Sequence, residues 1–186
     1  FSRAGVIRGL HYHARGQDDL FACLRGTARV VILDRETGEI ITIAGSDDDG
    51  YSGDDGPATA AQLNTPSAVA AAGNGDIYIA DTLNYRIRMI DHATGLIHTV
   101  AGTGTPGDSE SVGDGGPAVL AELQSPWDVA VDSAGRLLIA DYAQIRRVDA
   151  TGTITRIAGT VQPGYSGDGG PATAAALGAV LGVAAD

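Results

Sequence analysis

Two histidines near the start of the chain, His11 and His13, have the residue type and the spacing that chemistry could use. Residues two apart in a β-strand point to the same face, so both imidazoles would be presented together. Such a pair could move a proton as a general base or bind a metal ion. A metal site made with Asp19 would be incomplete, because zinc or iron normally takes a third or fourth protein ligand. The alternative is two histidines on an edge strand with no catalytic role.

Aspartates in glycine-rich loops form a second candidate site. These residues are Asp47, Asp48, Asp49, Asp54, Asp55, Asp114 and Asp168. Calcium prefers oxygen ligands, so Asp48 and Asp54 are candidate calcium ligands, and no other cofactor is expected. The spacing departs from the EF-hand loop, because position 3 counted from Asp48 is Gly50 and position 12 is Thr59. The alternative is that aspartate and glycine cap turns here.

Acidic and basic residues also recur together. Asp81 and Asp141 each follow a strand-like run, and Arg86 or Arg146 comes soon afterwards. We expect buried or half-buried Asp–Arg pairs that tie neighbouring turns together. The alternative is that these residues line a ligand-binding face.

Trp127 is the one tryptophan, and it stands where the preceding repeat has Ser67. A tryptophan near the entrance of a repeat could stack on a ligand, and the alternative, which we favour, is that it fills the core. The sequence contains no Gly-x-Ser-x-Gly elbow, phosphate-binding loop or His-Glu-x-x-His motif, so a hydrolase or nucleotide enzyme has no support.

Composition narrows the function classes. The chain has 186 residues and a net charge of −11, and this charge argues against a nucleic-acid partner. The single cysteine, Cys23, excludes an intramolecular disulfide and any Cys-x-x-Cys site. The longest apolar run, residues 174–185, is too short for a membrane span and contains Gly178 and Gly182.

A sequence repeat defines the strands and loops that would position these candidate residues. The runs Ile-Ala-Gly at 43–45, Val-Ala-Gly at 100–102 and Ile-Ala-Gly at 157–159 are spaced by 57 residues. A loop at 50–66 precedes predicted strands at 68–72, 76–81, 85–91 and 96–100, and the next unit predicts strands at 127–131, 136–141 and 145–149. Leu63 and Leu123 are expected to anchor the loop copies to the core. Four short strands per unit are typical of a propeller blade.

The amino-acid sequence of the repeated unit resembles the bacterial type of NHL repeat. The resemblance rests on GYSGDDGPATAAQL at 50–63, IYIADTLNYRIRMID at 77–91 and TGLIHTVAG at 94–102, and it covers about residues 39–186. It implies a β-propeller of about six blades that binds a protein or glycan through its faces and loops. It also slightly favours an extracytoplasmic location.

The first 38 residues resemble a different family. The string GVIRGLHYH at 5–13, followed by Gln17, Leu20 and Gly26, is similar to the start of dTDP-4-dehydrorhamnose 3,5-epimerases, which are cupin barrels. That resemblance implies that His11 is the base and that Arg8 helps to hold a sugar nucleotide. Asp19 departs from the pattern, because those enzymes carry a lysine there.

We therefore predict an all-β fold, a partial β-propeller of four-stranded NHL-type blades with a cupin-like strand segment at 1–38. The propeller part divides into 39–95, 96–152 and a partial unit at 153–186. Sliding the repeat back by 57 residues makes residues 29–34 the third strand of a preceding half blade, and the first strand of another blade is expected at the end.

The chain starts at Phe1, and Val180 stands where Pro66 and Pro126 close the earlier loops. We therefore expect a fragment of a longer propeller, or copies that self-associate to complete a ring. The leading functional hypothesis is a non-enzymatic binding or scaffold module. The alternative is an epimerase-like sugar-nucleotide isomerase.

Overall fold

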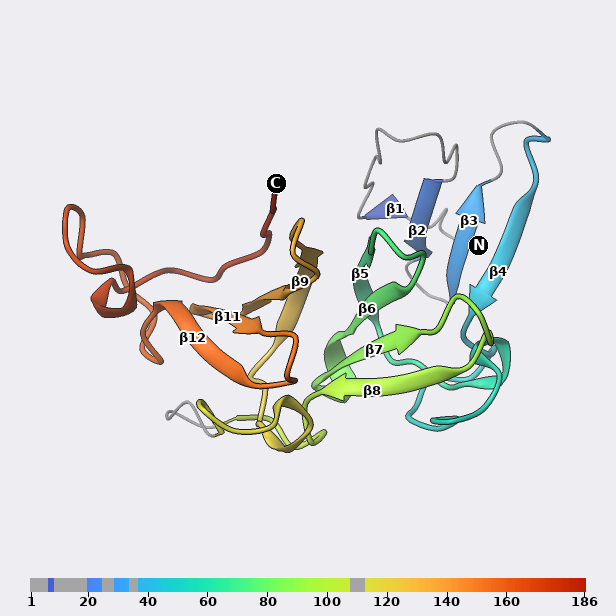
Figure 1. Cartoon of the computed structure of the whole chain (residues 1–186), viewed down its shortest axis with the longest axis horizontal. Coiled ribbons are helices and arrows are strands. Elements are labelled where there is room, and N and C mark those ends of the chain that lie inside the picture. Colours follow the sequence, from blue (N-terminus) through green and yellow to red (C-terminus); the bar gives the residue numbers. More distant parts are fainter. Residues whose placement is uncertain (1–6, 9–19, 25–28, 34–36, 108–112) are drawn as a thin grey trace, which may run out of the picture.

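The computed structural model describes residues 7–8, 20–24, 29–33, 37–107 and 113–186 (Figure 1). The described strands form three antiparallel sheets of four strands each, and in each sheet the order follows the sequence. The strands are β1 (Ile7–Arg8), β2 (Leu20–Leu24), β3 (Val30–Leu33) and β4 (Ile40–Ala44); β5 (Pro66–Ala71), β6 (Ile77–Asp81), β7 (Arg86–Ile90) and β8 (Ile97–Ala101); and β9 (Pro126–Val131), β10 (Leu137–Asp141), β11 (Gln144–Val148) and β12 (Ile154–Gly159). The all-β expectation is therefore confirmed.

Four short 3₁₀ turns complete the described elements. They are η1 (Ala58–Ala60), η2 (Thr82–Asn84), η3 (Ala118–Leu120) and η4 (Ala172–Ala174). Three of them, η1, η3 and η4, occupy the same place in the three copies of the glycine-rich loop, directly after a proline. In the described part of the chain, no helix is long and apolar enough to cross a membrane.

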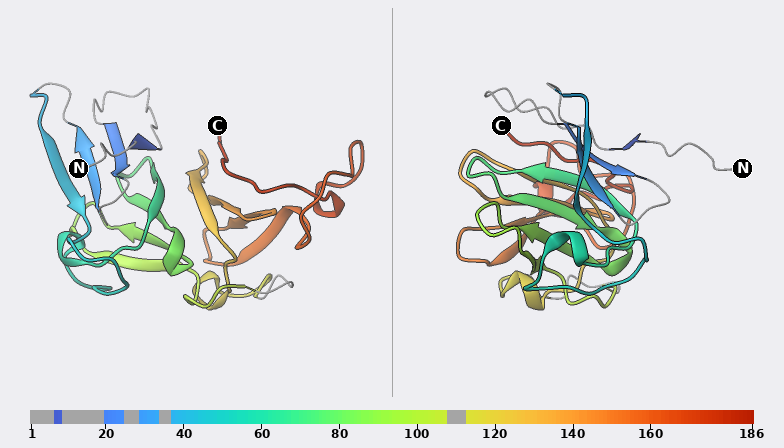
Figure 2. Two further views of the ribbon diagram at one scale, coloured as in Figure 1. Left: turned by 180° about the vertical axis from the view of Figure 1, so that it is seen from behind. Right: turned by 90° about the vertical axis from the view of Figure 1, so that its right-hand side faces the viewer.

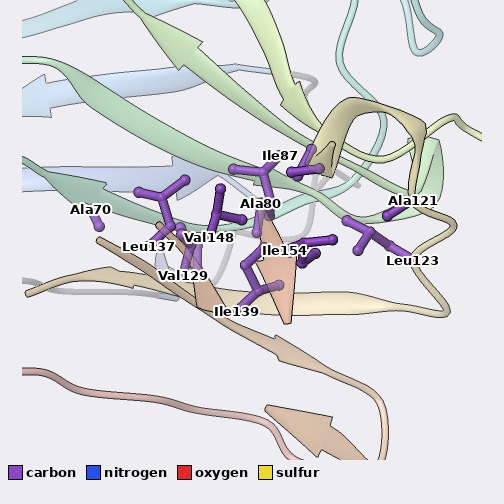
Figure 3. Packing of buried hydrophobic residues seen from close by; sticks show 13 residues of the cluster. Ala70, Ala80, Ile87, Ala121, Leu123, Val129, Leu137, Ile139, Val148 and Ile154 are labelled. Carbon is purple, nitrogen blue, oxygen red and sulfur yellow. The ribbon is translucent and has the colours of Figure 1, made fainter. Parts of the chain in front are cut away.

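The sheets lie side by side, with β5 between β2 and β9 (Figure 1). The second sheet is covered on both faces, so alternate residues of β5 enter different cores. Ala68 and Ala70 belong to the cluster shared with the third sheet, whereas Val69 belongs to the cluster shared with the first. Figure 3 shows the first of these clusters.

The loops contribute to both cores. Leu63 and Leu123 are completely buried, one in each cluster, as expected from their place in the repeat. Burial of a leucine side chain stabilises a fold by about 1.5–3 kcal/mol. These two residues therefore hold their loops against the sheets.

The sequence repeat and the sheets are out of phase by one strand. The unit at 39–95 contains β4, which pairs with β3 of the first sheet, together with β5, β6 and β7 of the second. Likewise, the unit at 96–152 gives β8 to the second sheet and β9, β10 and β11 to the third. Each unit thus joins two neighbouring sheets through main-chain hydrogen bonds.

The cupin-like interpretation of residues 1–38 finds no support. Within that segment β1, β2 and β3 join β4 in a sheet of the same order as the other two. The expected half blade is thus a four-stranded sheet. The expectation that this run is a third strand is confirmed for Val30–Leu33, because β3 takes the third position in the sheet.

Residues 177–186 differ from the expected first strand of a further blade. They carry no assigned strand. They return from the outer edge of the third sheet toward β9 (Figure 2). The Val180 amide donates to the Tyr142 carbonyl at 2.6 Å, and the Val183 amide donates to Asp128 Oδ2 at 2.9 Å. An extended segment becomes a strand only when a neighbour pairs with it, and no described strand does so here.

Candidate functional site

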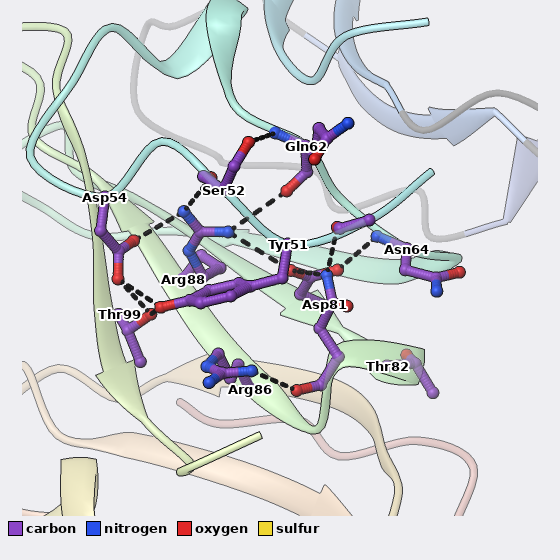
Figure 4. Close-up of polar contacts among 12 residues, drawn as sticks. Tyr51, Ser52, Asp54, Gln62, Asn64, Asp81, Thr82, Arg86, Arg88 and Thr99 are labelled. Carbon is purple, nitrogen blue, oxygen red and sulfur yellow. Dashed lines mark hydrogen bonds and ion pairs between the residues drawn. The ribbon is translucent and has the colours of Figure 1, made fainter. Parts of the chain in front are cut away.

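A buried arginine, Arg88, organises the best-defined polar cluster (Figure 4). Its side chain is completely buried, and its guanidinium contacts the glycine-rich loop on one side and β6 on the other. The contacts are Nη2 to Asp54 Oδ1 at 2.6 Å, Nη2 to the Ser52 carbonyl at 3.1 Å, Nη1 to the Gln62 carbonyl at 3.4 Å and Nη1 to Asp81 Oδ2 at 3.5 Å. The arginine therefore clamps both ends of the loop to the sheet.

The second repeat builds the same cluster around Arg146. Its Nη2 contacts Asp114 Oδ1 at 2.7 Å, its Nη1 donates to the Glu122 carbonyl at 2.8 Å, and Nη1 lies 3.7 Å from Asp141 Oδ2. Each arginine sits at an irregularity in the ladder to the fourth strand, where the register shifts between this arginine and the residue before it. Both clamps therefore lie beside the same irregularity of the sheet, in which the fourth strand has one extra residue.

The Asp–Arg pairing expected for the second repeat is present between Asp141 and Arg146. In the first repeat the structure differs from the expectation, because Asp81 pairs with Arg88 and not with Arg86. Arg86 instead lies over the ring of Tyr51, 3.6 Å from its centroid, and donates to the carbonyl of Asn84 at 3.0 Å.

Tyr51 joins the arginine cluster to the neighbouring strand. The Arg88 guanidinium lies 4.9 Å from the centroid of its ring, in addition to the Arg86 guanidinium described above. Its hydroxyl donates to Asp54 Oδ2 at 2.8 Å and lies 3.2 Å from the Thr99 hydroxyl. The tyrosine therefore combines cation–π contacts with a hydrogen bond to the carboxylate that neutralises Arg88.

The pKa values of the two carboxyl groups that face Arg88 are shifted in opposite directions. Burial raises the pKa of Asp81 to about 6, although the Asn64 amide, Asn84 and Arg88 all favour its ionised form. For Asp54, burial is outweighed by hydrogen bonds from Thr99 and Tyr51 and by the charge of Arg88, and the pKa is lowered. Burial also raises the pKa of Asp141.

Asp81 and Asp141 also fix the end of each loop. Asp81 Oδ1 accepts the Asn64 amide at 2.7 Å, and Asp141 Oδ1 accepts the amides of Gln124 and Ser125 at 2.8 Å. These carboxylate oxygens accept hydrogen bonds from backbone amides at the loop–strand junction, which would otherwise be buried without a partner. The arrangement is a structural clamp that holds the loops in a defined position.

The predicted calcium ligands, Asp48 and Asp54, do not belong to a metal-binding group of side chains among the described residues. Asp48 is exposed, whereas Asp54 already faces the Arg88 guanidinium, which repels a further cation. Among the described residues no group of three or more histidine, cysteine or acidic side chains could hold a metal. The residues therefore do not fit the calcium site suggested by the sequence.

Trp127 is not a member of either clamp. Trp127 is partly buried on β9, and its carbonyl accepts a hydrogen bond from the Ser67 hydroxyl at 2.6 Å. His11, and the side chain of Arg8 on β1, lie outside what the structure describes.

A surface that sequence reasoning missed lies along the loops. We call it the loop face; it consists of residues 45–65, 102–107, 113–125 and 160–179 with the turns at 82–85 and 142–143. The turns contact the loops, since the Leu83 amide donates to the Asn64 carbonyl at 3.1 Å and the Tyr142 amide donates to the Ser125 carbonyl at 3.1 Å. Most of the exposed large hydrophobic residues of the described chain lie here: Tyr51, Leu83, Val119, Leu120 and Tyr165.

Val119 and Leu120 are the clearest apolar pair on the loop face, with 45% and 67% of their surfaces exposed. The first copy of the loop has Thr59 and Ala60 at these places. Aligning the three copies and looking for bulky residues where the others are small would have found this pair.

Comparison with known proteins identifies the repeat. The family profile described as "Teneurin NHL domain" matches residues 29–91 and 92–174. Mouse Teneurin-3 is 39% identical over 95 residues, which is 46% of this chain and 4% of that protein. Chicken NHL repeat-containing protein 2 is 35% identical over 99 residues, which is 53% of this chain and 13% of that protein. The chain thus spans only a small part of these relatives.

Solved structures show the same fold. A protein of unknown function from Bacteroides thetaiotaomicron superposes with a TM-score of 0.69 at 19% identity, over 93% of this chain and 40% of that one. A chain of a nidogen/laminin complex superposes with a TM-score of 0.57 at 18% identity, over 83% of this chain and 49% of that one. At such identities the likeness concerns the fold alone.

Proposed function

This chain belongs to the teneurin NHL domain family, and from that premise we propose that it is a non-enzymatic binding module whose loop face docks a protein partner. The observation that carries the proposal is the exposed aliphatic pair Val119 and Leu120, placed on a loop that the Arg146 clamp holds rigid. Protein interfaces typically combine an apolar centre with a polar rim.

The loop face also carries exposed acidic residues. Asp55 exposes 86% of its side chain, and Asp48 is exposed as well. A partner with an apolar patch and nearby basic residues would therefore complement this surface in polarity and charge. Aliphatic side chains favour a protein over a glycan, because sugars are recognised mainly by aromatic stacking and polar groups.

Preorganisation supports binding through these loops. The clamp fixes the loop ends through buried charge-assisted hydrogen bonds, so little conformational entropy would be lost when a partner binds. In the second loop, the Leu120 amide also donates to the Pro117 carbonyl at 3.0 Å, which fixes the backbone beside the exposed pair.

The proposal is tested by selecting a random peptide display library on the immobilised full chain. Enriched peptides should bind saturably, and their affinity should fall at least about tenfold in the double variant Val119→Ser/Leu120→Ser, because burial of two aliphatic side chains is lost. A matched control is Ile40→Ser/Ile41→Ser on the outer strand β4, where two exposed isoleucines lie away from the loop face.

Equal losses in the two double variants would argue against the loop face as the binding surface. Selective binding to a glycan array that depends on the same pair would assign the face to a glycan and contradict a protein partner. An absence of saturable binding in both screens would also contradict the proposal.

A further inference from the structure

An asparagine–glycine pair, Asn74–Gly75, lies in the turn that joins β5 to β6. Asn74 is exposed, and the turn is closed by a hydrogen bond from the Gly75 amide to the Ala72 carbonyl at 3.0 Å. Gly75 has a φ of 95°, a conformation that favours glycine. The pair therefore combines an accessible side-chain amide with a following residue that has no side chain.

The side chain of Asn74 is folded back over the residues that follow it. Its Oδ1 accepts the Asp76 amide at 3.2 Å, and its Nδ2 donates to Asp76 Oδ2 at 2.7 Å. An asparagine bonded to the backbone two residues further on forms an Asx turn. The side-chain carbonyl is thereby held against its own backbone, where the Gly75 nitrogen is the adjacent nucleophile in the chain.

The other two asparagines of the chain differ from Asn74. Asn84 is buried and is followed by Tyr85. Asn64 is followed by the β-branched Thr65. A bulky side chain on the next residue restricts the approach of that residue's backbone nitrogen to the side-chain amide. Attack by the following nitrogen is therefore least hindered at Asn74.

We propose that Asn74 is a site of spontaneous deamidation in the folded protein. The Gly75 nitrogen loses its proton and forms a bond to Cγ of Asn74, and the side-chain amide leaves with that proton as ammonia. The product is a cyclic succinimide. Water then opens the ring at one of its two carbonyls, which gives aspartate or isoaspartate at position 74. Water is the one co-reactant, and no atom is oxidised or reduced.

The hydrogen bond between Gly75 and Ala72 limits the rate of this reaction. The Gly75 amide must leave the Ala72 carbonyl before its nitrogen can attack, so the reaction proceeds from molecules in which the turn has opened locally. Such openings need little free energy at an exposed turn, where few contacts are lost. Global unfolding speeds the reaction but is not required for it.

The modification acts on a contact between two turns. Asp76 Oδ1 accepts the His92 amide at 2.9 Å, which ties the turn at 73–76 to the turn at 91–95. A Cβ added at Gly75 would lie 2.8 Å from Cγ of His92, so the imidazole packs directly against the glycine. After deamidation, a carboxylate replaces the amide that donated to Asp76, and two like charges face each other. Deamidation therefore weakens this hairpin.

The equivalent turn of the next sheet offers an internal comparison. Its closing bond runs from the Gly135 amide to the Asp132 carbonyl at 2.9 Å. Ala134 stands at the place of Asn74, and Arg136 follows two residues later, where the first turn has an aspartate. This turn therefore has the same closing bond without the reactive amide, and it carries a cation in place of a carboxylate.

The reactive turn lies away from the loop face. It precedes β6, whereas the turn at 82–85, which belongs to the loop face, follows β6. The two turns are therefore at opposite ends of that strand. The effect of deamidation falls on the stability of the second sheet and not on the residues of the loop face.

The test incubates the full chain under native conditions at mildly alkaline pH and follows conversion of amide to acid by tandem mass spectrometry. All three asparagines fall in one tryptic peptide, residues 36–86, so Asn64 and Asn84 serve as internal controls. We expect Asn74 to convert at least about tenfold faster than either, with incorporation of oxygen from labelled water and a mixture of aspartate and isoaspartate. Equal or slower conversion at Asn74, or conversion that starts only when urea unfolds the chain, would overturn the proposal.

Two variants assign the reactivity to the dipeptide and its turn. Asn74→Gln should abolish conversion at this position, because glutamine would have to close a larger ring. Ala134→Asn places the same dipeptide in the equivalent turn and should gain conversion there. A chain with Ala134→Asn that stays unmodified in that turn would contradict the assignment to the turn, and an unchanged rate in Asn74→Gln would contradict the proposed chemistry.

The effect on the hairpin is measured with Asn74→Asp, which mimics the aspartate product. The equilibrium constant for unfolding in urea should rise about two- to tenfold, because a hydrogen bond is replaced by repulsion between like charges. The matched control, Ala134→Asp, adds the same charge to the equivalent turn near Arg136 and should change that constant less than about twofold. Equal effects of the two variants would refute the role given to Asp76.

Discussion

Replacing Arg88 with methionine is the most direct test of the clamp. Methionine fills the space of the arginine stem but donates no hydrogen bond, so Asp81 is left buried without a cation and Asp54 loses its partner. Breaking a buried pair by removing one member typically costs about 3–5 kcal/mol. We therefore expect Arg88→Met to lower the free energy of unfolding by about 3–5 kcal/mol at pH 7, measured by urea unfolding followed by far-UV circular dichroism.

Two further variants separate the ionic effect from loss of packing. In the double variant Arg88→Met/Asp81→Asn the buried charge is absent, so at least about 1 kcal/mol should be recovered relative to Arg88→Met. The control is Arg136→Met, which removes an exposed ion pair with Asp132 at 2.6 Å and should cost less than about 1 kcal/mol. If Arg88→Met costs no more than Arg136→Met, the reasoning that Arg88 holds the loop is refuted.

The remaining predictions concern pH and the loop. Because the pKa of Asp81 is raised to about 6 in the folded protein, its contribution to stability is fully present below its unfolded value of 3.8 and is lost as the pH rises through about 6. The loss should approach about 3 kcal/mol by pH 7, and chemical unfolding of Asp81→Asn should show a flatter pH dependence. Gly53→Ala should lower the melting temperature more than Gly95→Ala, since both glycines have positive φ but only an added Cβ at Gly53 meets other atoms. Tyr51→Phe should cost about 1 kcal/mol through lost hydrogen bonds, whereas Tyr165→Phe should leave urea unfolding unchanged; a cost at both positions would contradict the difference in their surroundings.

The strands and the repeat were predictable because they follow local patterns. The two-residue period of a strand places Arg86 and Arg88 on one face of β7, and both guanidinium groups lie beside the Tyr51 ring. Leu63 could be assigned to the core from its recurrence as Leu123. Such patterns report which face a residue occupies, which is what periodicity encodes.

The clamp partner could not be predicted in the same way. Asp81 lies opposite Arg86 in the ladder, so counting along the sequence favours that pair. Arg88 is instead held by a loop that arrives from the preceding sheet, through the Ser52 carbonyl and Asp54. A contact between segments 34 residues apart, such as Arg88 with Asp54, is a property of the assembled sheets.

The first 38 residues show the limit of motif matching. The string at 5–13 resembled an epimerase through a few glycines and histidines, whereas β2 and β3 pair as the middle strands of a sheet like the other two. Sheet pairing in that segment depends on the alternation of side chains and on the neighbouring strand β4. Motif matching takes neither of them into account.

The offset between repeat and sheet has a consequence for how such a chain can change its length. A gene duplication with breakpoints in the equivalent hairpins at 92–95 and 149–152 inserts one whole unit, which brings the last strand of one sheet and the first three of the next. Every sheet is still complete after this event, and no exposed strand edge is created. Unequal crossing-over in these short turns therefore leaves the strand pairing inside each sheet unchanged and alters only the number of sheets.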